Sequence, residues 1–332
     1  MAATQPEKAD CEVFDVITMG RVGVDIYPQQ IGVGLEDVSS FGKFLGGSPT
    51  NVAVAAARYG RRAAVITKTG ADPFGRFIHN ALQGYGVDDR FVGASAHLPT
   101  PVTFCEIFPP DDFPLYFYRF PTAPDLDIHA DELDFDAIGA AKVFWVTVTG
   151  LCQEPSRSAT LAALEARGKS GITVLDLDYR PRFWDSPQAA RDWVKLALPH
   201  VTVAVGNREE CEVAVGATDT PAEAAVALRE AGVSLAVVKQ GPKGVLALDD
   251  TGQVEVPPAP VTVVNGLGAG DAFGGALVHG LLAGWETERI MRFANAAGAH
   301  VAGELACSDA MPTEAEVERK LQEATFEGGP VA

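Results

Sequence analysis

Apolar residues recur along the chain with two different periods. Continuous runs of Val, Ile, Leu and Ala are typical of buried parallel strands, which we expect at 13–19, 63–67, 142–148, 172–177, 201–205 and 235–239. Between them, apolar residues three and four positions apart predict helices at 50–59, 74–85, 156–167, 189–198 and 221–230. This alternation predicts an α/β fold whose mostly parallel sheet is covered by helices on both faces. Ligands of such sheets bind beyond the carboxyl ends of the strands.

Two segments, 26–44 and 101–120, depart from this pattern. They are rich in Gly, Pro, aromatic and β-branched residues, and polar and apolar positions alternate as in short strands. We expect them to form short strands that are inserted into the α/β core. Residues 13–324, these two segments included, are predicted to form one domain. A disordered tail is predicted at 1–12 and a second tail at 325–332.

Composition narrows the classes of partner. The chain has 332 residues, of which 47% are hydrophobic and 21% charged, as in ordinary globular proteins. No apolar run is long enough for a membrane helix, the N-terminus lacks the features of a signal peptide, and we expect no membrane partner. The net charge of −18 argues against nucleic acid but not against ATP, which needs only local positive groups. Five scattered cysteines without a C-x-x-C pair predict reduced thiols and a cytoplasmic protein.

The run Gly-Leu-Gly-Ala-Gly-Asp at 266–271 carries the most specific chemistry. Its glycines allow close approach of the backbone to a ligand, and apolar residues with helical spacing follow it. The N-terminus of a helix favours an anion such as phosphate. Asp271 would then lie beside that anion, where it could take a proton from an attacking hydroxyl. The alternative is a tight loop that caps a core helix, with Asp271 as a surface residue.

Two other phosphate motifs do not fit this run. The dinucleotide fingerprint G-x-G-x-x-G requires glycine where Asp271 stands, and it normally opens the first βαβ unit rather than a C-terminal one. The Walker A pattern does not occur in the sequence. The run therefore favours phosphoryl transfer by a different class of enzyme.

Four motifs together resemble the PfkB/ribokinase family of carbohydrate kinases. The run 268–271 is similar to the C-terminal signature of that family, and Gly-Gly-Ser-Pro-Thr-Asn at 46–51 to its second signature. Between them, 207–210 resembles the N-x-x-E element and 239–244 the nucleotide-binding turn. The resemblance implies a ribokinase-like three-layer α/β sandwich with a mostly parallel central sheet and a small β-sheet lid, which the segments 26–44 and 101–120 would form. It also implies ATP-dependent phosphorylation of a small-molecule sugar with Mg²⁺.

The resemblance implies a role for each motif. Asp271 would be the base, and the backbone N–H groups of Gly268, Ala269 and Gly270 would hold the γ-phosphate. The sugar would be held by Asp25, Gly46, Gly47 and Asn51. Taken alone, Gly46, Gly47 and Asn51 would equally suit a loop before an N-capped helix.

The nucleotide side of the site is implied in the same way. Glu210 would act on Mg²⁺ through water, because this ion keeps several waters and takes few protein ligands. The nucleotide itself would be lined by Asn207, Lys239, Gly241, Gly244 and Asn295. For Asn295 a role in helix packing fits equally well.

Three cations are candidates for an acidic group on the substrate. Arg119 lies on the expected lid, and Lys68 follows a predicted strand. Arg180 belongs to a D-x-N-x-R-like element in which Asp178 replaces the usual Asn, and its planar fork suits a carboxylate or a phosphate. The alternatives are an ion pair of Arg180 with Asp176 or Asp178 and a solvated Lys68.

One departure from the family pattern bears on the substrate. Many members carry Asp-Thr-Thr before the glycine signature, whereas this chain has Asn-Gly-Leu at 265–267, so a requirement for K⁺ stays open. Together with 178–181, 113–119 and 306–313, this run resembles the inositol-catabolic branch of the family, whose members phosphorylate the C6 hydroxyl of 5-dehydro-2-deoxygluconate, a sugar acid.

Other functions and assemblies stay open at this level. One alternative is a kinase for 2-keto-3-deoxygluconate, fructose or ribose. Another is a non-catalytic sugar-binding regulator, which would be expected to have lost the base or the glycine loop. An exposed lid could also pair across a homodimer.

Overall fold

A ten-stranded sheet forms the centre of the molecule. The computed structural model describes residues 13–327; the expected tail at 1–12 and residues 328–332 lie outside the described part. The strand order is β14-β13-β12-β11-β10-β9-β1-β4-β5, with β6 paired to β4. All neighbouring strands are parallel except the pairs β12–β13 and β13–β14 at one edge, which are antiparallel. Its strands are β1 (Val16–Met19), β4 (Ala63–Gly70), β5 (Val87–Asp88), β6 (Val92–Ser95), β9 (Val143–Thr147), β10 (Ile172–Asp176), β11 (Val203–Asn207), β12 (Leu235–Lys239), β13 (Val245–Asp249) and β14 (Gly252–Val256).

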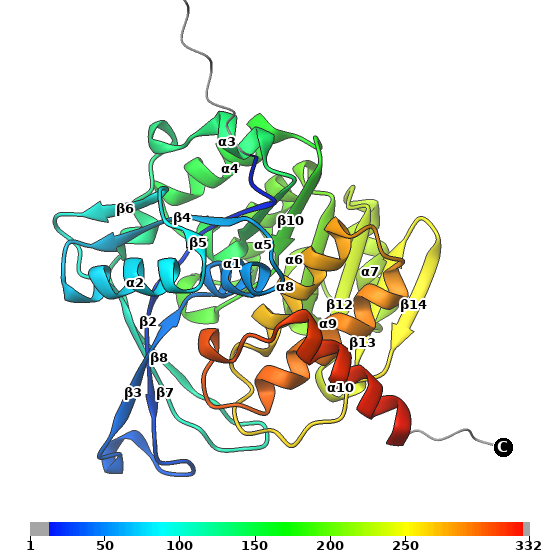
Figure 1. Cartoon of the computed structure of the whole chain (residues 1–332). Helices are drawn as coiled ribbons and strands as arrows, with labels where there is room; N and C mark the ends of the chain where they lie inside the picture. Colours follow the sequence, from blue (N-terminus) through cyan, green and yellow to red (C-terminus); the bar gives the residue numbers. More distant parts are fainter. Residues whose placement is uncertain (1–12, 328–332) are drawn as a thin grey trace, which may run out of the picture.

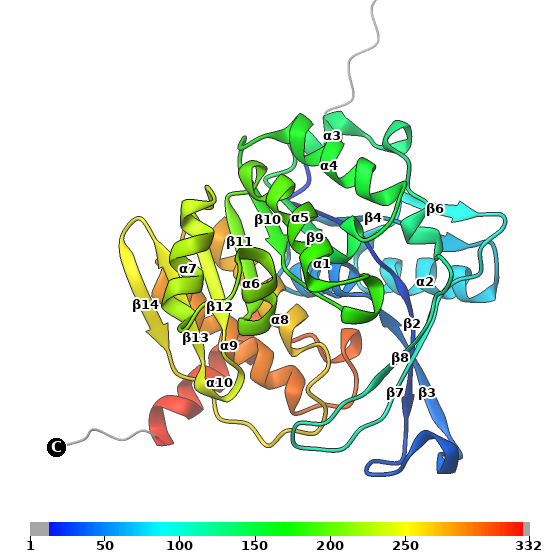
Figure 2. The same cartoon turned by 180° about the vertical axis from the view of Figure 1, so that it is seen from behind.

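Helices cover both faces of this sheet. Figure 1 shows α1, α2, α8, α9 and α10 in front of it, and Figure 2 shows α3 to α7 behind it. The helices are α1 (Ser48–Arg58), α2 (Pro73–Gly84), α3 (Phe135–Ala140), α4 (Ser156–Arg167), α5 (Pro187–Ala197), α6 (Arg208–Val215), α7 (Pro221–Glu230), α8 (Ala269–Leu282), α9 (Thr287–Ala302) and α10 (Glu314–Glu327). No helix among residues 13–327 is both long and apolar enough to cross a membrane.

Alternation along the strands divides the interior into two cores. Val143 and Trp145 of β9 pack in the cluster with α1, α8 and α9, whereas Phe144 and Val146 pack in the cluster with α4 to α7. Successive side chains of a strand point to opposite faces, so a continuous apolar run fits a sheet covered on both sides. The prediction of a three-layer α/β sandwich is therefore confirmed.

The small second sheet has the order β3-β2-β7-β8. Its strands are β2 (Gly23–Pro28), β3 (Phe41–Gly46), β7 (Val102–Cys105) and β8 (Leu115–Tyr118). They come from the two segments expected to form the lid, although β2 begins before residue 26 and β3 ends after residue 44. We call this four-stranded sheet the lid. It projects from one side of the central sheet (Figure 1).

All the expected strands and helices are present, with ends shifted by a few residues. The hairpin β13–β14 was not foreseen, because its two strands are joined by a short polar turn rather than by a helix. The C-terminal boundary also differs from the expectation. Helix α10 runs to Glu327, so residues 325–327 are helical rather than part of a tail.

Candidate functional site

A cavity of about 270 Å³ lies beyond the carboxyl ends of the central strands. Residues just after β1 and at the ends of β10, β11 and β12 line this cavity. This is the rim where parallel sheets hold their ligands. The residues from the predicted set that line it are Asp25, Gly47, Asn51, Arg180, Asn207, Glu210, Lys239, Gly268, Gly270 and Asp271.

Helix α8 points its N-terminus at this cavity. Gly268 is its N-cap residue, with φ of 81° and ψ of −12°, in the left-handed region that glycine adopts without strain. A Cβ on Gly268 would also lie only 2.6 Å from the Sγ of Cys307, so a side chain has no room there. Ala269 opens the helix, and Asp271 falls in its first turn, as predicted. The free N–H groups of this turn are suited to an anion.

Asp271 is held by a residue of the glycine motif at 46–51. The Nδ2 of Asn51, on α1, donates to Oδ2 of Asp271 at 2.7 Å. The Oδ1 of Asn51 accepts a hydrogen bond at 2.6 Å from Oγ of Ser308. Burial raises the pKa of Asp271, while the bonds from Asn51 and Ser48 and the charge of Arg21 act against the increase. A carboxylate with a raised pKa in a phosphate site is suited to the role of general base.

Asp25 occupies the lid side of the cavity. Its Oδ2 accepts a hydrogen bond at 2.9 Å from the hydroxyl of Tyr27, which lies 2.8 Å from the Sγ of Cys307. Gly46 lies directly against this carboxylate, because a Cβ there would come within 2.2 Å of Cγ of Asp25. Burial raises the pKa of Asp25 to about 6. Gly46 therefore does not line the cavity; its lack of a side chain leaves room for the carboxylate of Asp25.

Two arginines from distant parts of the chain share one carboxylate. The Nη2 of Arg180 lies 2.6 Å from Oδ1 of Asp178, and the Nε of Arg21 lies 3.5 Å from Oδ2 of the same residue. Burial would raise the pKa of Asp178, but Arg180 and Arg21 outweigh it and lower that pKa. The ion pair expected as the alternative for Arg180 is therefore present, while both guanidinium groups still line the cavity.

Lys239 and Asn207 line both this cavity and a neighbouring one, and Glu210 lines only this one. The Nζ of Lys239 lies 3.4 Å from the position that a Cβ on Gly270 would take, so the ammonium faces the glycine loop. Burial would lower its pKa, but Glu210, Asp176 and Asp271 raise it, which keeps Lys239 charged. Asn207 and Glu210 cap α6 reciprocally, with Asn207 N to Glu210 Oε2 at 2.6 Å and Glu210 N to Asn207 Oδ1 at 2.9 Å.

A second cavity, of about 290 Å³, continues from Asn207 and Lys239 toward the turn at 241–243. Gly241 lines it, with φ of 56°. Gly244 does not line it; with φ of 92° it lets the chain pass Val256, whose carbonyl oxygen would lie 2.0 Å from a Cβ on Gly244. Both glycines are therefore required by the backbone of the turn.

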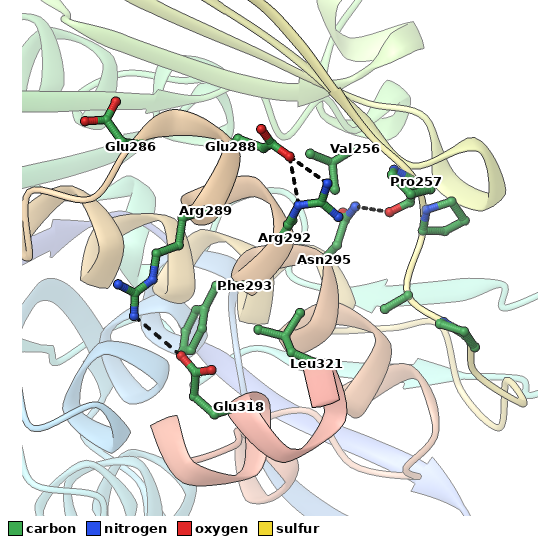
Figure 3. Close-up of a pocket in the computed structure, with 13 residues that line it drawn as sticks. Val256, Pro257, Glu286, Glu288, Arg289, Arg292, Phe293, Asn295, Glu318 and Leu321 are labelled. Atoms are coloured by element: carbon green, nitrogen blue, oxygen red, sulfur yellow. Dashed lines mark hydrogen bonds and ion pairs between the residues drawn. The ribbon is translucent and has the colours of Figure 1, made fainter. Parts of the chain in front are cut away.

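A third and larger cavity, of about 790 Å³, lies between the 256–260 segment, α9 and α10. Figure 3 shows Asn295 on α9 donating to the carbonyl oxygen of Pro257, at 2.9 Å. The arginines on the same wall are paired, Arg292 with Glu288 at 2.6 Å and Arg289 with Glu318 at 3.7 Å (Figure 3). Asn295 thus lines a cavity and also ties α9 to the segment after β14.

The other two candidate cations have partners of their own. The Nη2 of Arg119 lies 2.6 Å from Oδ2 of Asp125, and both side chains are buried, at 5% and 1% exposure. The Nζ of Lys68 lies 2.6 Å from Oε2 of Glu132 and donates to the carbonyl oxygen of Asp127. Neither residue lines the cavity that holds Asp271. The structure thus places them apart from the site where sequence reasoning had expected them.

Several cavity residues were not predicted. Arg21 and Tyr27 line the cavity without belonging to a recognised motif, whereas Ser48, Asp176 and Cys307 lie within recognised runs but were not assigned a role in binding or catalysis. Arg21 could have been found, because it follows the first strand and so must lie at the carboxyl edge of the sheet. Among residues 13–327, no group of three or more His, Cys, Asp and Glu side chains is arranged to hold a metal ion.

Comparison with known proteins gives consistent matches. The family model described as pfkB family carbohydrate kinase matches residues 13–314. A 5-dehydro-2-deoxygluconokinase of Clostridium perfringens is 32% identical over 306 residues, 90% of each chain. That of Geobacillus kaustophilus is 32% identical over 316 residues, 93% of this chain and 94% of the relative.

Solved structures match as well. A double mutant of the fructokinase of Vibrio cholerae, in its fructose, ADP and potassium ion bound form, superposes with a TM-score of 0.80 at 26% identity. The match covers 93% of this chain and 99% of the fructokinase. The ribokinase-like fold expected from the motifs is therefore confirmed.

Proposed function

The chain belongs to the pfkB family of carbohydrate kinases, and on that premise we propose that it transfers the γ-phosphoryl group of ATP to the C6 hydroxyl of 5-dehydro-2-deoxy-D-gluconate, a step of myo-inositol catabolism. One observation carries the proposal. Asp271, in the first turn of α8, meets Asn51 of the other glycine motif at 2.7 Å inside a cavity that two arginines also line. A base, an anion site and positive charge for an acidic sugar therefore occupy one space.

Asp271 would act as the general base. Its carboxylate takes the proton of the C6 hydroxyl while that oxygen forms a bond to the γ-phosphorus. The bond between the γ-phosphorus and the bridging oxygen breaks, and ADP leaves with the electron pair. The N–H groups of Gly268, Ala269 and Gly270 would receive the charge that spreads over the phosphoryl oxygens. The protein's contribution is then mainly position and charge.

The nucleotide would extend from the cavity of Asp271 into the second cavity, which shares Asn207 and Lys239 with it, and on toward the third. Lys239, which faces the glycine loop, is suited to the phosphates, and the 241–243 turn continues from it. The large cavity at Asn295 has the size for the base and ribose. Glu210 would hold Mg²⁺ through water, and Mg²⁺ would help to neutralise the phosphate charge. Because the reaction consumes ATP, we expect it to take place in the cytoplasm.

Arg21 and Arg180 are the cations that we assign to the carboxylate of the sugar acid. Both line the cavity, and Asp178 holds them side by side although they are far apart in the chain. Two guanidinium groups with one shared counter-ion leave positive charge for a second carboxylate. Asp25 and Asn51 would hold the sugar hydroxyls, because both accept hydrogen bonds and Asn51 also donates them.

The lid offers a surface for a second copy of the chain. Tyr118 is 68% exposed and Phe41 39% exposed, and each packs edge-to-face on Phe104 of the lid. Exposed aromatic residues on a sheet face are typical of protein interfaces. We therefore include a homodimer formed through the lid in the proposal; its test is the molar mass in solution of the wild type and of Tyr118→Ser.

The test of the function is a coupled ADP-release assay with ATP and magnesium. The substrates are 5-dehydro-2-deoxygluconate, 2-keto-3-deoxygluconate, fructose and ribose, each with and without K⁺. We expect the highest kcat/KM for the first. Preference for a neutral sugar would leave a kinase but remove the carboxylate role of the arginines. Failure with every substrate, with ATP still bound, would favour another sugar or a non-catalytic regulator.

A further inference from the structure

Ser308 is a buried hydroxyl next to the proposed base. It begins the short 3₁₀ helix η8 (Ser308–Ala310) and is 1% exposed. Its Oγ lies 2.6 Å from Oδ1 of Asn51 and 2.9 Å from the carbonyl oxygen of Leu45. The same Asn51 side chain donates to Asp271 at 2.7 Å. Ser308 therefore touches the residue that holds the base, without touching the base itself.

The Ser308 hydroxyl has fewer protons to donate than it has oxygen neighbours. A hydroxyl has one proton to donate and two lone pairs that accept, yet Oγ of Ser308 faces two oxygens. It can donate to only one of them at a time. A primary amide, by contrast, has a donating and an accepting end, and turning it by 180° exchanges them. The hydroxyl and the amide can therefore satisfy each other in either orientation.

The two orientations correspond to the two states of Asp271. When Asp271 is ionised, it accepts from Nδ2 of Asn51, and Ser308 donates to Oδ1. When Asp271 is protonated, it donates to Oδ1 of a reversed Asn51, Nδ2 then donates to Ser308, and the Ser308 proton turns to the oxygen of Leu45. Ser308 thus makes one hydrogen bond when Asp271 is ionised and two when Asp271 is protonated, because only then does Leu45 also receive its proton.

We propose that Ser308 is a positioning residue for the base: it donates to the Asn51 amide while Asp271 is ionised, and after Asp271 has taken the substrate proton it stabilises the protonated base by accepting from the reversed amide and donating to Leu45. The proposal deepens the proposed function and rests on it for the role of Asp271. It assigns a task to the segment before α10, which the motifs of the active site do not include. Asn51 then has a second task beyond contact with the sugar.

Other charges also act on Asp271, and the test must hold them constant. They come from the loop after β1, from the lid strand β2, from the end of β10 and the loop that follows it, from β12 and from the segment before η8. The groups are Arg21, Asp25, Asp176, Asp178, Arg180, Lys239 and Cys307. None of them is changed by a substitution at 308, so a shift measured there reports on the amide.

The measurement is the midpoint of the Asp271 titration in the full chain. It is followed by NMR of ¹³C-labelled aspartate carboxyls, with the Asp271 signal identified by its loss in Asp271→Asn. For Ser308→Ala we expect the midpoint to fall by about 0.5–1 pH unit, because Ser308 makes one more hydrogen bond when Asp271 is protonated than when it is ionised. The acid limb of kcat/KM should move to lower pH by the same amount. Ser308→Thr keeps the hydroxyl and should titrate like the wild type.

Ser308→Cys, nearly isosteric with a weaker donor, should give an intermediate midpoint and keeps the test open if Ser308→Ala does not fold. An unchanged or raised midpoint in both Ser308→Ala and Ser308→Cys, or an equal fall in Ser308→Thr, would overturn the proposal. The NMR titration needs no turnover, so it distinguishes this outcome from a failure of the proposed function. Without turnover on any substrate, a lowered midpoint would still support the role of Ser308.

Discussion

The amide nitrogen of Asn51 lies 2.7 Å from a carboxylate oxygen of Asp271, although 220 positions separate the two residues in the chain. Asn51 belongs to the helix after the first glycine motif, and Asp271 to the helix after the second. Helices α1 and α8 pack on the same face of the sheet, as Figure 1 shows. Their N-terminal turns therefore meet at the carboxyl edge of the strands, which brings the proposed base and a proposed sugar ligand side by side.

Asp271→Asn should remove most of the activity. The amide cannot take the proton of the hydroxyl, so kcat should fall by about 10²–10⁴. Nucleotide affinity measured by calorimetry should change little, because the backbone N–H groups of the loop remain. Asp136→Asn, on the exposed side of α3, is the matched control and should leave both quantities unchanged. Retained turnover in Asp271→Asn would remove Asp271 as the base.

Asp25→Asn should stabilise the fold while weakening sugar binding. The folded-state pKa of about 6 lies above the unfolded value of 3.8, so the folded state binds more protons between them. The free energy of unfolding therefore falls as the pH rises through this interval. At pH 7 the neutral amide should raise stability by about 1–2 kcal/mol, less than the full shift because solvent reaches the cavity. Urea unfolding at pH 4 and pH 7 checks the sign: the gain should be confined to the higher pH.

Gly268→Ala should damage the anion loop. The left-handed φ of 81° disfavours any side chain, and the new Cβ would meet the Sγ of Cys307 at 2.6 Å. We expect a loss of about 1–3 kcal/mol of stability and a fall in kcat of at least tenfold. Gly139→Ala, with open space around its Cβ, is the control. The double variant with Cys307→Ala should recover only part of the loss; full recovery would show that φ costs nothing here.

Arg21→Ala should raise KM for the sugar acid by about tenfold or more and leave KM for ATP nearly unchanged. A guanidinium that faces a substrate carboxylate contributes about 1.5–3 kcal/mol. A neutral sugar such as fructose is the control substrate, for which the change should be small. Steady-state kinetics on both sugars gives the comparison. An equal loss for the two sugars would assign Arg21 to the architecture of the site rather than to the carboxylate.

Arg119→Ala should act on stability. It leaves Asp125 buried at 1% exposure without its partner, which costs about 3–5 kcal/mol in comparable buried pairs. The exposed Lys142, paired with Asp15, is the control, and its removal should cost at most about 1 kcal/mol. Chemical denaturation compares the two. A rise in KM for the sugar acid without loss of stability would instead support the substrate role expected for Arg119 from the sequence.

The layers of the fold and the local geometry of the glycine loop could be predicted from short stretches of sequence. Apolar periodicity is local, so strands and helices such as β12 and α4 could be placed within a few residues. The left-handed Gly268, with Asp271 in the first turn after it, also follows from neighbours in the chain. These features depend on backbone sterics and on the helix dipole, both of which act over a few residues.

Which charged side chains line the cavity of Asp271 depends on long-range packing. Arg21 contacts Asp178, 157 positions away in the chain, and both residues line the cavity. Arg119 instead pairs with Asp125 and does not line the cavity. No local pattern separates these arginines, because the energy of a charge depends on its burial and on partners that only the folded chain supplies. The same holds for Ser308, whose position beside Asn51 exists only once the segment before α10 has packed against α1.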